Sequence, residues 1–499
     1  MQIFLFLFLS WLVFEPGMPS SALDYENEED IGRQIALSFI DTEGFQPTQE
    51  QLDIAKNIGI NLIEVSDPVQ IDNLSLNQFH ILLGSEHRYL TVHQIETSVP
   101  DLIRSTTAHY RSMSDQYSNR IAAISLFYFP ADFKESFYQL AATIADSLSS
   151  ETDKPIYYQS AQSRISQLPE SFSFKSARFG ASESDIIPFP VVYFEPDENT
   201  VESLKALELL LNQSLQLQES IIILPADWFF ERISHQPDVE VLLSSYLEGD
   251  EVLFPMPEAD ENIPSIHFGV IFLFLLWASF IVHYRYQPLF RGFVARYFFN
   301  HSFFVADIME HRIRNLSSGI TLLIQHGFIV GLFFYTFSNI LFTNSGLSAL
   351  SHHFPAIMIA GYEAESFFVI GIILAFLSHL VSVFWIYLLN KELKHLSQTV
   401  NLYSWILTTN LLIITILVYM EQQQVAVEWA LVAGGLFLLI WFFSFNFAAI
   451  DASKYLTKYR TLNIFLTVGL HVLILISVFL FILFIPGFFE TVELTLWLP

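Results

Sequence analysis

The 499-residue sequence contains no cysteine. Disulfide bonds, thiolate zinc sites and cysteine nucleophiles are therefore excluded, and an exported domain must be held by core packing alone. No G-x-x-x-x-G-K-[ST], G-x-G-x-x-G, H-E-x-x-H or G-x-S-x-G motif occurs either. These absences argue only against nucleotide-driven enzymes and zinc proteases.

Basic residues are scarce in the first half of the chain. Residues 23–265 hold 40 Asp and Glu against 13 Lys and Arg, whereas residues 266–499 hold ten of each. The strong negative charge of the first half repels nucleic acid and anionic lipid headgroups, and it keeps a domain soluble. We therefore expect an acidic, solvated domain with no nucleic-acid partner.

The first residues are typical of an export signal. Residues 3–14 form an apolar run too short to favour a membrane span, and Ser20 and Ala22 fit a small-residue cleavage site. We predict a signal peptide over 1–22, with an uncleaved anchor as the alternative. In either case the following domain is delivered outside the cytoplasm.

Residues 23–250 alternate between short apolar runs and amphipathic segments. Helices are expected at 48–59, 134–148 and 198–216, where apolar residues recur every three or four positions. The expected strands lie at 35–40, 60–65, 79–84, 121–128, 155–160, 172–177, 189–195 and 220–225. Repeated strand–helix alternation predicts an α/β fold, a compact degenerate (β/α)₈ barrel. An open doubly wound sheet is the alternative.

The second half of the sequence is a membrane domain. A Pro-rich acidic linker covers 251–266, an all-α polytopic domain covers 267–485, and a tail covers 486–499. Six apolar runs are long enough to cross a bilayer. The predicted transmembrane helices lie at about 267–284, 319–342, 366–390, 401–420, 429–449 and 461–485.

The distribution of basic residues between the loops predicts the orientation. All ten Lys and Arg of residues 266–499 lie in the first, third and fifth loops, and the second loop, the fourth loop and the tail hold none. Basic loops stay in the cytoplasm. We therefore expect a bacterial inner-membrane protein whose N-terminal domain and C-terminus are both extracytoplasmic.

Candidate binding residues follow the expected strands, because the chemistry of a β/α barrel sits at the carboxyl ends of its strands. Carboxylates and an indole in this position suit a glycan ligand. The candidates for ligand binding are Glu64, Glu86, Arg88, Glu195, Asp227 and Trp228; His87, Asp41, Glu43, Asp132 and Asp197 occupy similar positions.

The segment TQEQLDIAKNIGINLIEVS (48–66) resembles the opening of glycosidase-type (β/α)₈ barrels. The resemblance implies a catalytic pair of carboxylates, an Asn-Glu after strand four and a Glu after strand seven. Strand four here ends in FYFPADF (127–133), without Glu, while Glu195 does stand at the end of strand seven. If the barrel is a glycoside hydrolase, Glu195, Asp132 and Glu64 are the catalytic candidates.

Within the spans as bounded above, the last five contain no Asp, Glu, Lys or Arg, which argues against an ion-driven carrier. His326, His379 and His471 do lie inside spans. They are low-ranked candidates for haem or metal ligands, and hydrogen bonding between packed helices is the favoured interpretation. We expect no cofactor.

The first cytoplasmic loop and the second span, through SSGITLLIQHGFIVGLFF (317–334), resemble uncharacterised multi-span envelope proteins of bacteria. That resemblance implies no known activity. The sequence favours an envelope membrane protein with a non-catalytic, ligand- or glycan-binding barrel that acts in sensing or assembly, with the lipid bilayer and a glycan or envelope protein as partners. A membrane-tethered glycoside hydrolase is one alternative; a solute carrier or haem-containing membrane protein is the other.

Overall fold

The computed structural model describes residues 33–40, 45–66, 78–85, 87–117, 119–162, 172–180, 191–196, 200–217, 220–254, 267–359, 364–423, 425–456, 458–485 and 487–498. The predicted signal peptide and most of the predicted linker lie outside these residues. The same is true of the candidate residues Asp41, Glu43, Glu86 and Asp197.

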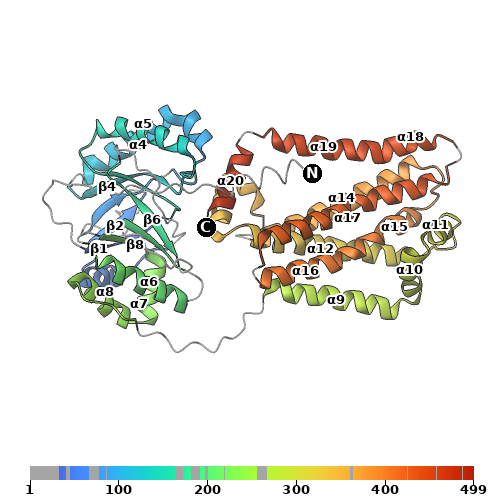
Figure 1. The fold of residues 1–499 in the computed structure, drawn as a ribbon, viewed down its shortest axis with the longest axis horizontal. Coiled ribbons are helices and arrows are strands. Elements are labelled where there is room, and N and C mark those ends of the chain that lie inside the picture. The colour runs from blue at the N-terminus through green and yellow to red at the C-terminus, as the bar shows by residue number, and fades with distance from the viewer. Residues whose placement is uncertain are drawn as a thin grey trace.

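The N-terminal half is a closed barrel of eight parallel strands in sequential order, as expected (Figure 1). The barrel closes where β1 pairs with β8, from Arg33 against Ser220 to Ser38 against Pro225. The strands are β1 (Arg33–Ser38), β2 (Leu62–Val65), β3 (His80–Leu83), β4 (Ile121–Tyr128), β5 (Ile156–Gln159), β6 (Phe174–Gly180), β7 (Val191–Glu195) and β8 (Ser220–Pro225). Each overlaps a strand predicted from the sequence.

Side chains alternate between the inside and the outside of the barrel, as the period of two in a strand requires. In β1, Ile35 and Leu37 pack outward in the layer between sheet and helices, while Ala36 belongs to the interior cluster. In β5, Tyr158 packs outward and Tyr157 packs inward. Both faces are apolar, which explains why these strands read as continuous apolar runs.

The outer layer consists of helices that follow the strands. These are α2 (Gln49–Ile58), α4 (Val92–Tyr117), α5 (Glu135–Ser149), α6 (Thr200–Ser214), α7 (Ala226–His235) and α8 (Asp238–Glu248). Helix α2 begins at a capping box between Thr48 and Gln51 and ends at Gly59, which has a φ of 106°. The signals that located α2 in the sequence therefore define its two ends.

Among its described residues, the C-terminal half contains six helices that are long and apolar enough to span a membrane. They are Phe268–Tyr286, Ser317–Leu341, Glu365–Leu389, Leu396–Gln422, Val427–Ser453 and Arg460–Phe481. Some of these helices extend further than predicted and include acidic residues near their ends, such as Glu421 and Asp451. The spans as bounded from the sequence contain no acidic residue, and the acids belong to the additional turns at the helix ends.

The labels of Figure 1 divide these spans where their helical geometry changes. The spans comprise α9 (Phe268–Tyr286), α12 (Ser317–Leu341), α14 (Ala364–Leu389), α15 (Leu396–Ser404) with α16 (Asn410–Gln422), α17 (Val427–Ser453), and α18 (Arg460–Ile464) with α19 (Leu470–Leu483). A 3₁₀ turn (Ile406–Thr409) interrupts the fourth span, and a π-helical turn (Phe465–Gly469) interrupts the sixth.

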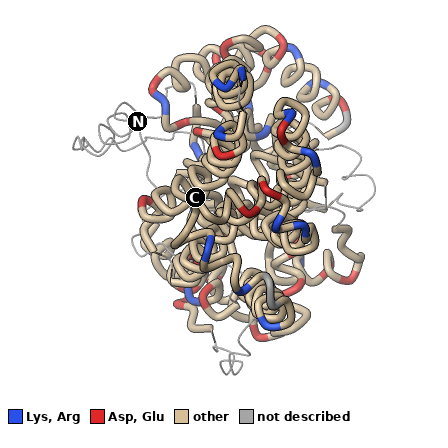
Figure 2. The backbone as a smooth tube through the Cα atoms, turned by 90° about the vertical axis from the view of Figure 1, so that its right-hand side faces the viewer, with Lys and Arg blue, Asp and Glu red and all other residues tan. Residues whose placement is uncertain are grey.

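Shorter helices lie at both ends of the bundle. Helices α10 (Pro288–Phe299) and α11 (His301–Met309) lie at the end far from the barrel, whereas α13 (Asn344–His353) and α20 (Phe488–Trp497) lie between bundle and barrel (Figure 1). The loops that carry the ten basic residues lie at the far end as well. Figure 2 faces that end and shows Lys and Arg on helix ends turned toward the viewer.

Candidate functional site at the mouth of the barrel

Two helices of the C-terminal half cover the carboxyl ends of the barrel strands. Ala349 of α13 and Leu494 of α20 are fully buried, and Leu498 is 2% exposed. All three belong to the same hydrophobic cluster as Tyr128 and Tyr193 of the barrel interior. The mouth, where a β/α barrel normally binds its ligand, is therefore filled by the protein's own helices.

Polar contacts surround this apolar contact between the barrel mouth and helices α13 and α20. Lys134 donates a hydrogen bond of 2.5 Å to Glu493 of α20, and their side chains are 33% and 39% exposed. The backbone amide of His93 donates to Glu490. His353 of α13 hydrogen-bonds through Nε2 to the carbonyl oxygen of Tyr89, 2.8 Å away. Together these contacts fix the orientation of α13 and α20 on the mouth.

Two aromatic residues at the mouth adopt a left-handed backbone conformation. Tyr89 has a φ of 53° and Phe129 a φ of 48°. A non-glycine residue in this region costs of order 1–2 kcal/mol. Tight packing holds both residues in place, because Tyr89 and Phe129 are 4% and 3% exposed and their ring centroids lie 6.3 Å apart. Strain of this kind concentrates at functional surfaces.

Glu195, the last residue of β7, takes part in the contact between the two halves. Its carboxylate forms an ion pair with Arg178 of β6. The hydroxyl of Ser345, in α13, donates a second bond of 3.0 Å to the other carboxylate oxygen. A glycosidase nucleophile must face the substrate. Here both oxygens of Glu195 already have partners.

Glu64 lies inside the barrel and is fully buried. Its carboxylate accepts hydrogen bonds from Ser38 at 2.7 Å, from Tyr157 at 2.7 Å and from the amide of Gln159. Burial raises the pKa of Glu64, and the three hydrogen bonds oppose that rise. Both carboxylate oxygens of Glu64 therefore accept hydrogen bonds from side chains inside the barrel.

Asp132 and Lys175 are buried in the layer outside the sheet. Asp132 accepts hydrogen bonds from Ser160 at 2.5 Å and from Gln162 at 3.3 Å. Burial raises the pKa of Asp132 and lowers that of Lys175, and the charge of each residue opposes the shift of the other. Gln159, which donates to Glu64, faces the inside of the barrel, so the next residue, Ser160, faces outward. Asp132 accepts from Ser160 and therefore lies on the opposite side of the sheet from Glu64.

The remaining candidates lie apart from one another. Arg88 places its guanidinium 5.7 Å from the ring centroid of Tyr128 at the mouth. Asp227 is exposed and accepts a hydrogen bond from the backbone amide of Trp228 in the first turn of α7. The indole of Trp228 packs on Phe194, which belongs to the outer layer.

The described geometry therefore does not assemble a pair of catalytic carboxylates. Glycoside hydrolysis needs two carboxyl groups on either side of the scissile bond, with room for the sugar between them. Glu64, Asp132 and Glu195 are each held by other protein groups and point into three different environments. What the mouth does provide is a surface that binds α13 and α20.

The residues that form this contact were hardly predictable from the sequence. Ser345, Arg178 and Glu493 were not candidates, because nothing in a short segment between or after spans predicts that it docks on a distant domain. The amphipathic pattern of 488–497, with Leu494 following Glu490 by four positions and Glu493 by one, was the one available signal.

Two of the three membrane histidines lie together. His326 and His379 are 3.1 Å apart between Nδ1 and Nε2, whereas His471 packs separately against Phe442 and Phe445. Hydrogen bonding between packed helices, the favoured interpretation, therefore applies to the first two. Among the residues that the structure describes, no cluster of three or more His, Cys, Asp or Glu is suited to a metal ion.

No protein-family model matches the sequence, and no curated protein matches it. Similar solved structures include a β-glucuronidase from Ruminococcus gnavus bound to D-glucaro 1,5-lactone, with a TM-score of 0.31 and 12% identity over 39% of this chain and 43% of the enzyme. Another is a GH2 β-galacturonidase from Eisenbergiella tayi bound to galacturonate, with a TM-score of 0.31 and 12% identity over 41% and 48% of the two chains.

The chain spans less than half of the length of these enzymes. The closed barrel is established by the strand pairing of the chain itself.

Proposed function

We propose that this chain is a bacterial inner-membrane protein whose extracytoplasmic barrel is non-catalytic and acts in sensing or assembly of the envelope. The observation that carries the proposal is the occupation of the barrel mouth by α13 and α20, with Leu494 fully buried among barrel residues. A barrel that used its mouth for turnover would leave that surface open to substrate.

The connection of these helices to the spans supports a sensing role. Helix α13 begins three residues after α12 ends, and α20 follows α19 after a short turn. A glycan or envelope protein that bound the mouth would have to displace both helices. Because a ligand shifts an equilibrium by its differential affinity for the two states, such binding would be transmitted directly to the second and sixth spans.

The orientation proposed from the loops agrees with the arrangement of the two halves. The barrel, α13 and α20 are at one end of the bundle, and the ten basic residues of the membrane domain are at the other. Basic residues in the cytoplasm put the barrel outside. The lipid bilayer is then the first partner of the chain, and envelope glycans or proteins are the second.

A membrane-tethered glycoside hydrolase is the competing function, and the position of Glu195 at the end of β7 favours it. The test is turnover of aryl glycosides and envelope glycans by the purified full-length protein, by E195Q and by D101N, a control at an acid of helix α4 that is 78% exposed. We expect no turnover above background in any of them. Turnover that E195Q abolishes and D101N retains would replace our proposal by the hydrolase, because loss of an essential carboxylate removes the catalytic route.

The sensing role has its own measurement. Hydrogen exchange of α13 and α20 in the full-length protein should increase when an envelope-glycan fraction is added, because displaced helices lose their buried contacts. An extract that binds the barrel while α13 and α20 remain fully protected would contradict a role of the mouth in sensing.

A further inference from the structure

A row of four hydrogen-bonded side chains lies buried among the spans of the C-terminal half. Asn410 Nδ2 lies 3.0 Å from His326 Nε2, His326 Nδ1 lies 3.1 Å from His379 Nε2, and His379 Nδ1 lies 2.9 Å from the Tyr403 hydroxyl. All four residues are buried, with exposures of 0% to 3%. They belong to α16, α12, α14 and α15, so the row joins three spans.

Both ends of this row lie at the break in the fourth span. Tyr403 is in the last turn of α15, Asn410 is the first residue of α16, and the 3₁₀ turn Ile406–Thr409 separates the two helices. Non-helical backbone at membrane depth is tolerated only where protein buries it or a cavity accepts it, and broken spans commonly surround transport sites. The histidines bridge this break from the two neighbouring spans.

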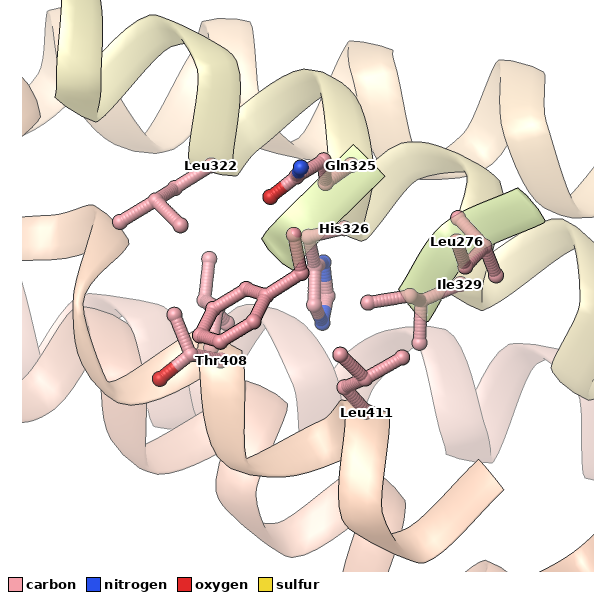
Figure 3. A pocket seen from close by; sticks show the side chains of 9 residues that line it. Leu276, Leu322, Gln325, His326, Ile329, Thr408 and Leu411 are labelled. Atoms are coloured by element: carbon pink, nitrogen blue, oxygen red, sulfur yellow. The ribbon is translucent and has the colours of Figure 1, made fainter. Parts of the chain in front are cut away.

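A small cavity touches the His326 end of the row. Its volume is about 10 Å³, and Gln325, His326 and Thr408 are its polar lining residues. Figure 3 shows the imidazole of His326 at this cavity, with Thr408 and Leu411 nearby. A space of this size with polar partners is at the lower limit for one water molecule.

Aromatic rings enclose the two histidines. Phe437 lies parallel to His326, with ring centroids 6.1 Å apart, and the indole of Trp441 contacts both His326 and His379. At the other end, the buried residues Ser382 and Ser444 lie near the Tyr403 hydroxyl. The row therefore has polar groups at both ends, and aromatic side chains surround its two histidines.

We propose that this row, Asn410–His326–His379–Tyr403, is a proton relay inside the membrane domain. A proton that arrives from the cavity binds His326 Nε2. The Nδ1 proton of His326 then passes to His379 Nε2, the Nδ1 proton of His379 passes to Tyr403, and the original hydroxyl proton of Tyr403 leaves toward Ser382 or Ser444. One proton enters and one leaves, and no other bond changes.

The same atoms accommodate the final state of the relay. In the starting state Asn410 Nδ2 donates to His326 Nε2, and in the final state His326 Nε2 carries a proton and needs an acceptor. Asn410 Oδ1 is buried and has no hydrogen-bond partner among the described residues. Rotation of the Asn410 amide supplies that acceptor. Before a second proton can follow, the amide must rotate back and both imidazoles must again carry their proton on Nδ1.

A purely structural role for these side chains is the rival, and His471 supplies the matched control. This residue is a third histidine within the spans but lies outside the row, packed on Phe442 and Phe445. The experiment reconstitutes the full chain in lipid vesicles loaded with a pH-sensitive dye. An inward proton gradient is applied while potassium and valinomycin hold the membrane potential. The rate of internal acidification is measured.

We expect wild type and H471L to acidify the vesicles faster than protein-free vesicles do, and H379L and Y403F to fall to the protein-free rate. Y403F keeps the ring and its packing, so it interrupts the relay even if H379L does not fold; thermal melting checks the fold of each variant. Three results would overturn the relay: wild type no faster than lipid alone, Y403F at the wild-type rate, or H471L as slow as Y403F with both variants folded.

Discussion

Ser345 donates a hydrogen bond of 3.0 Å to Glu195 and so joins α13 of the membrane domain to the end of barrel strand β7. Glu195 also pairs with Arg178 on the adjacent strand. Its position after strand seven made it a catalytic candidate through the resemblance to glycosidase-type barrels. In the structure the same position supports the attachment of the barrel to the spans.

The first prediction concerns this attachment. Phe133 and Trp497 stack with ring centroids 4.6 Å apart, across the contact between barrel and α20. Because the chain has no cysteine, the variant F133C/W497C offers a single pair of thiols. We expect a short bismaleimide to link them in native membranes, detected by mass spectrometry of the digested protein.

The control for this prediction places the second thiol at the opposite end of the bundle. Tyr459 is 78% exposed there, so F133C/Y459C has two reactive thiols too far apart to be joined within one molecule. Absence of the link in F133C/W497C, or equal linking in both variants, would show that the barrel does not dock on α20.

The barrel and the six spans were both predictable from the sequence, for a physical reason. Strands such as 121–128 and spans such as 366–390 are continuous apolar runs whose length alone separates the two classes. The docking helices were not predicted. Segments 344–353 and 488–497 are short, and their burial depends on the distant barrel surface that they cover.

The second prediction tests the buried pair Asp132 and Lys175. Each charge opposes the shift in pKa that burial gives the other group. The variant D132N removes the buried charge that favours the ammonium of Lys175, whose Nζ has no hydrogen-bond partner among the described residues. Loss of a buried counter-charge costs at most about 3–5 kcal/mol. We expect a markedly lower melting temperature in D132N. Recovery of most of this loss in D132N/K175M, which removes both charges, is the matched control; equal melting of D132N and wild type would mean that the pair is not charged.

The third prediction is a pH dependence at Glu64. Burial raises the pKa of this carboxyl in the folded barrel. The folded state therefore binds the proton more tightly than the unfolded state, whose pKa is about 4.3. The stabilisation is complete below that value and is lost as the pH rises through the folded pKa.

Relative to E64Q, whose side chain does not titrate, wild type should accordingly lose stability as the pH increases from about 4 toward neutrality. Melting temperatures of both proteins across this range give the difference directly. The difference in melting temperature between wild type and E64Q should change with pH. A constant difference, or one that shifts in favour of wild type as the pH rises, would contradict a raised pKa of Glu64.

The positions of the candidate site residues along the chain were predictable from the sequence, whereas the orientations of their side chains were not. Glu64, Asp132 and Glu195 were correctly placed at or near the carboxyl ends of strands, because strand boundaries follow the apolar runs. Their orientations were not predictable. A shift of one residue moves a side chain from the inside of a barrel to the outside, and Asp132 lies beyond the end of β4, where alternation no longer applies.

The fourth prediction concerns the packing of the second and third spans. A Cβ atom at Gly371 of α14 would lie 2.9 Å from the Cα of Gly331 and 2.9 Å from the carbonyl oxygen of Val330, both in α12. Small residues permit this close approach of two backbones. The variant G371A should therefore lower stability by about 1–3 kcal/mol, as overpacking does.

Gly435 of α17 provides the control, because a Cβ there would meet nothing within 4 Å. G435A should be neutral or stabilising by up to about 1 kcal/mol, the usual gain of alanine over glycine in a helix. Similar melting temperatures for G371A and G435A would mean that α12 and α14 do not pack this closely in the membrane.

The last prediction concerns orientation. The contact between α20 and the barrel requires the C-terminus and the barrel to be on the same side of the membrane, and the ten basic residues at the other end of the bundle place that side outside the cytoplasm. A reporter that is active only in the cytoplasm should therefore be inactive when fused after Pro499. The same reporter should be active when inserted between α14 and α15, beside Lys391 and Lys394. Because both fusions contain the complete first three spans, their expression and insertion can be compared directly on the same gel. Activity of the C-terminal fusion would mean that α20 cannot contact an extracytoplasmic barrel. That result would contradict both the proposed orientation and the sensing role of the barrel mouth.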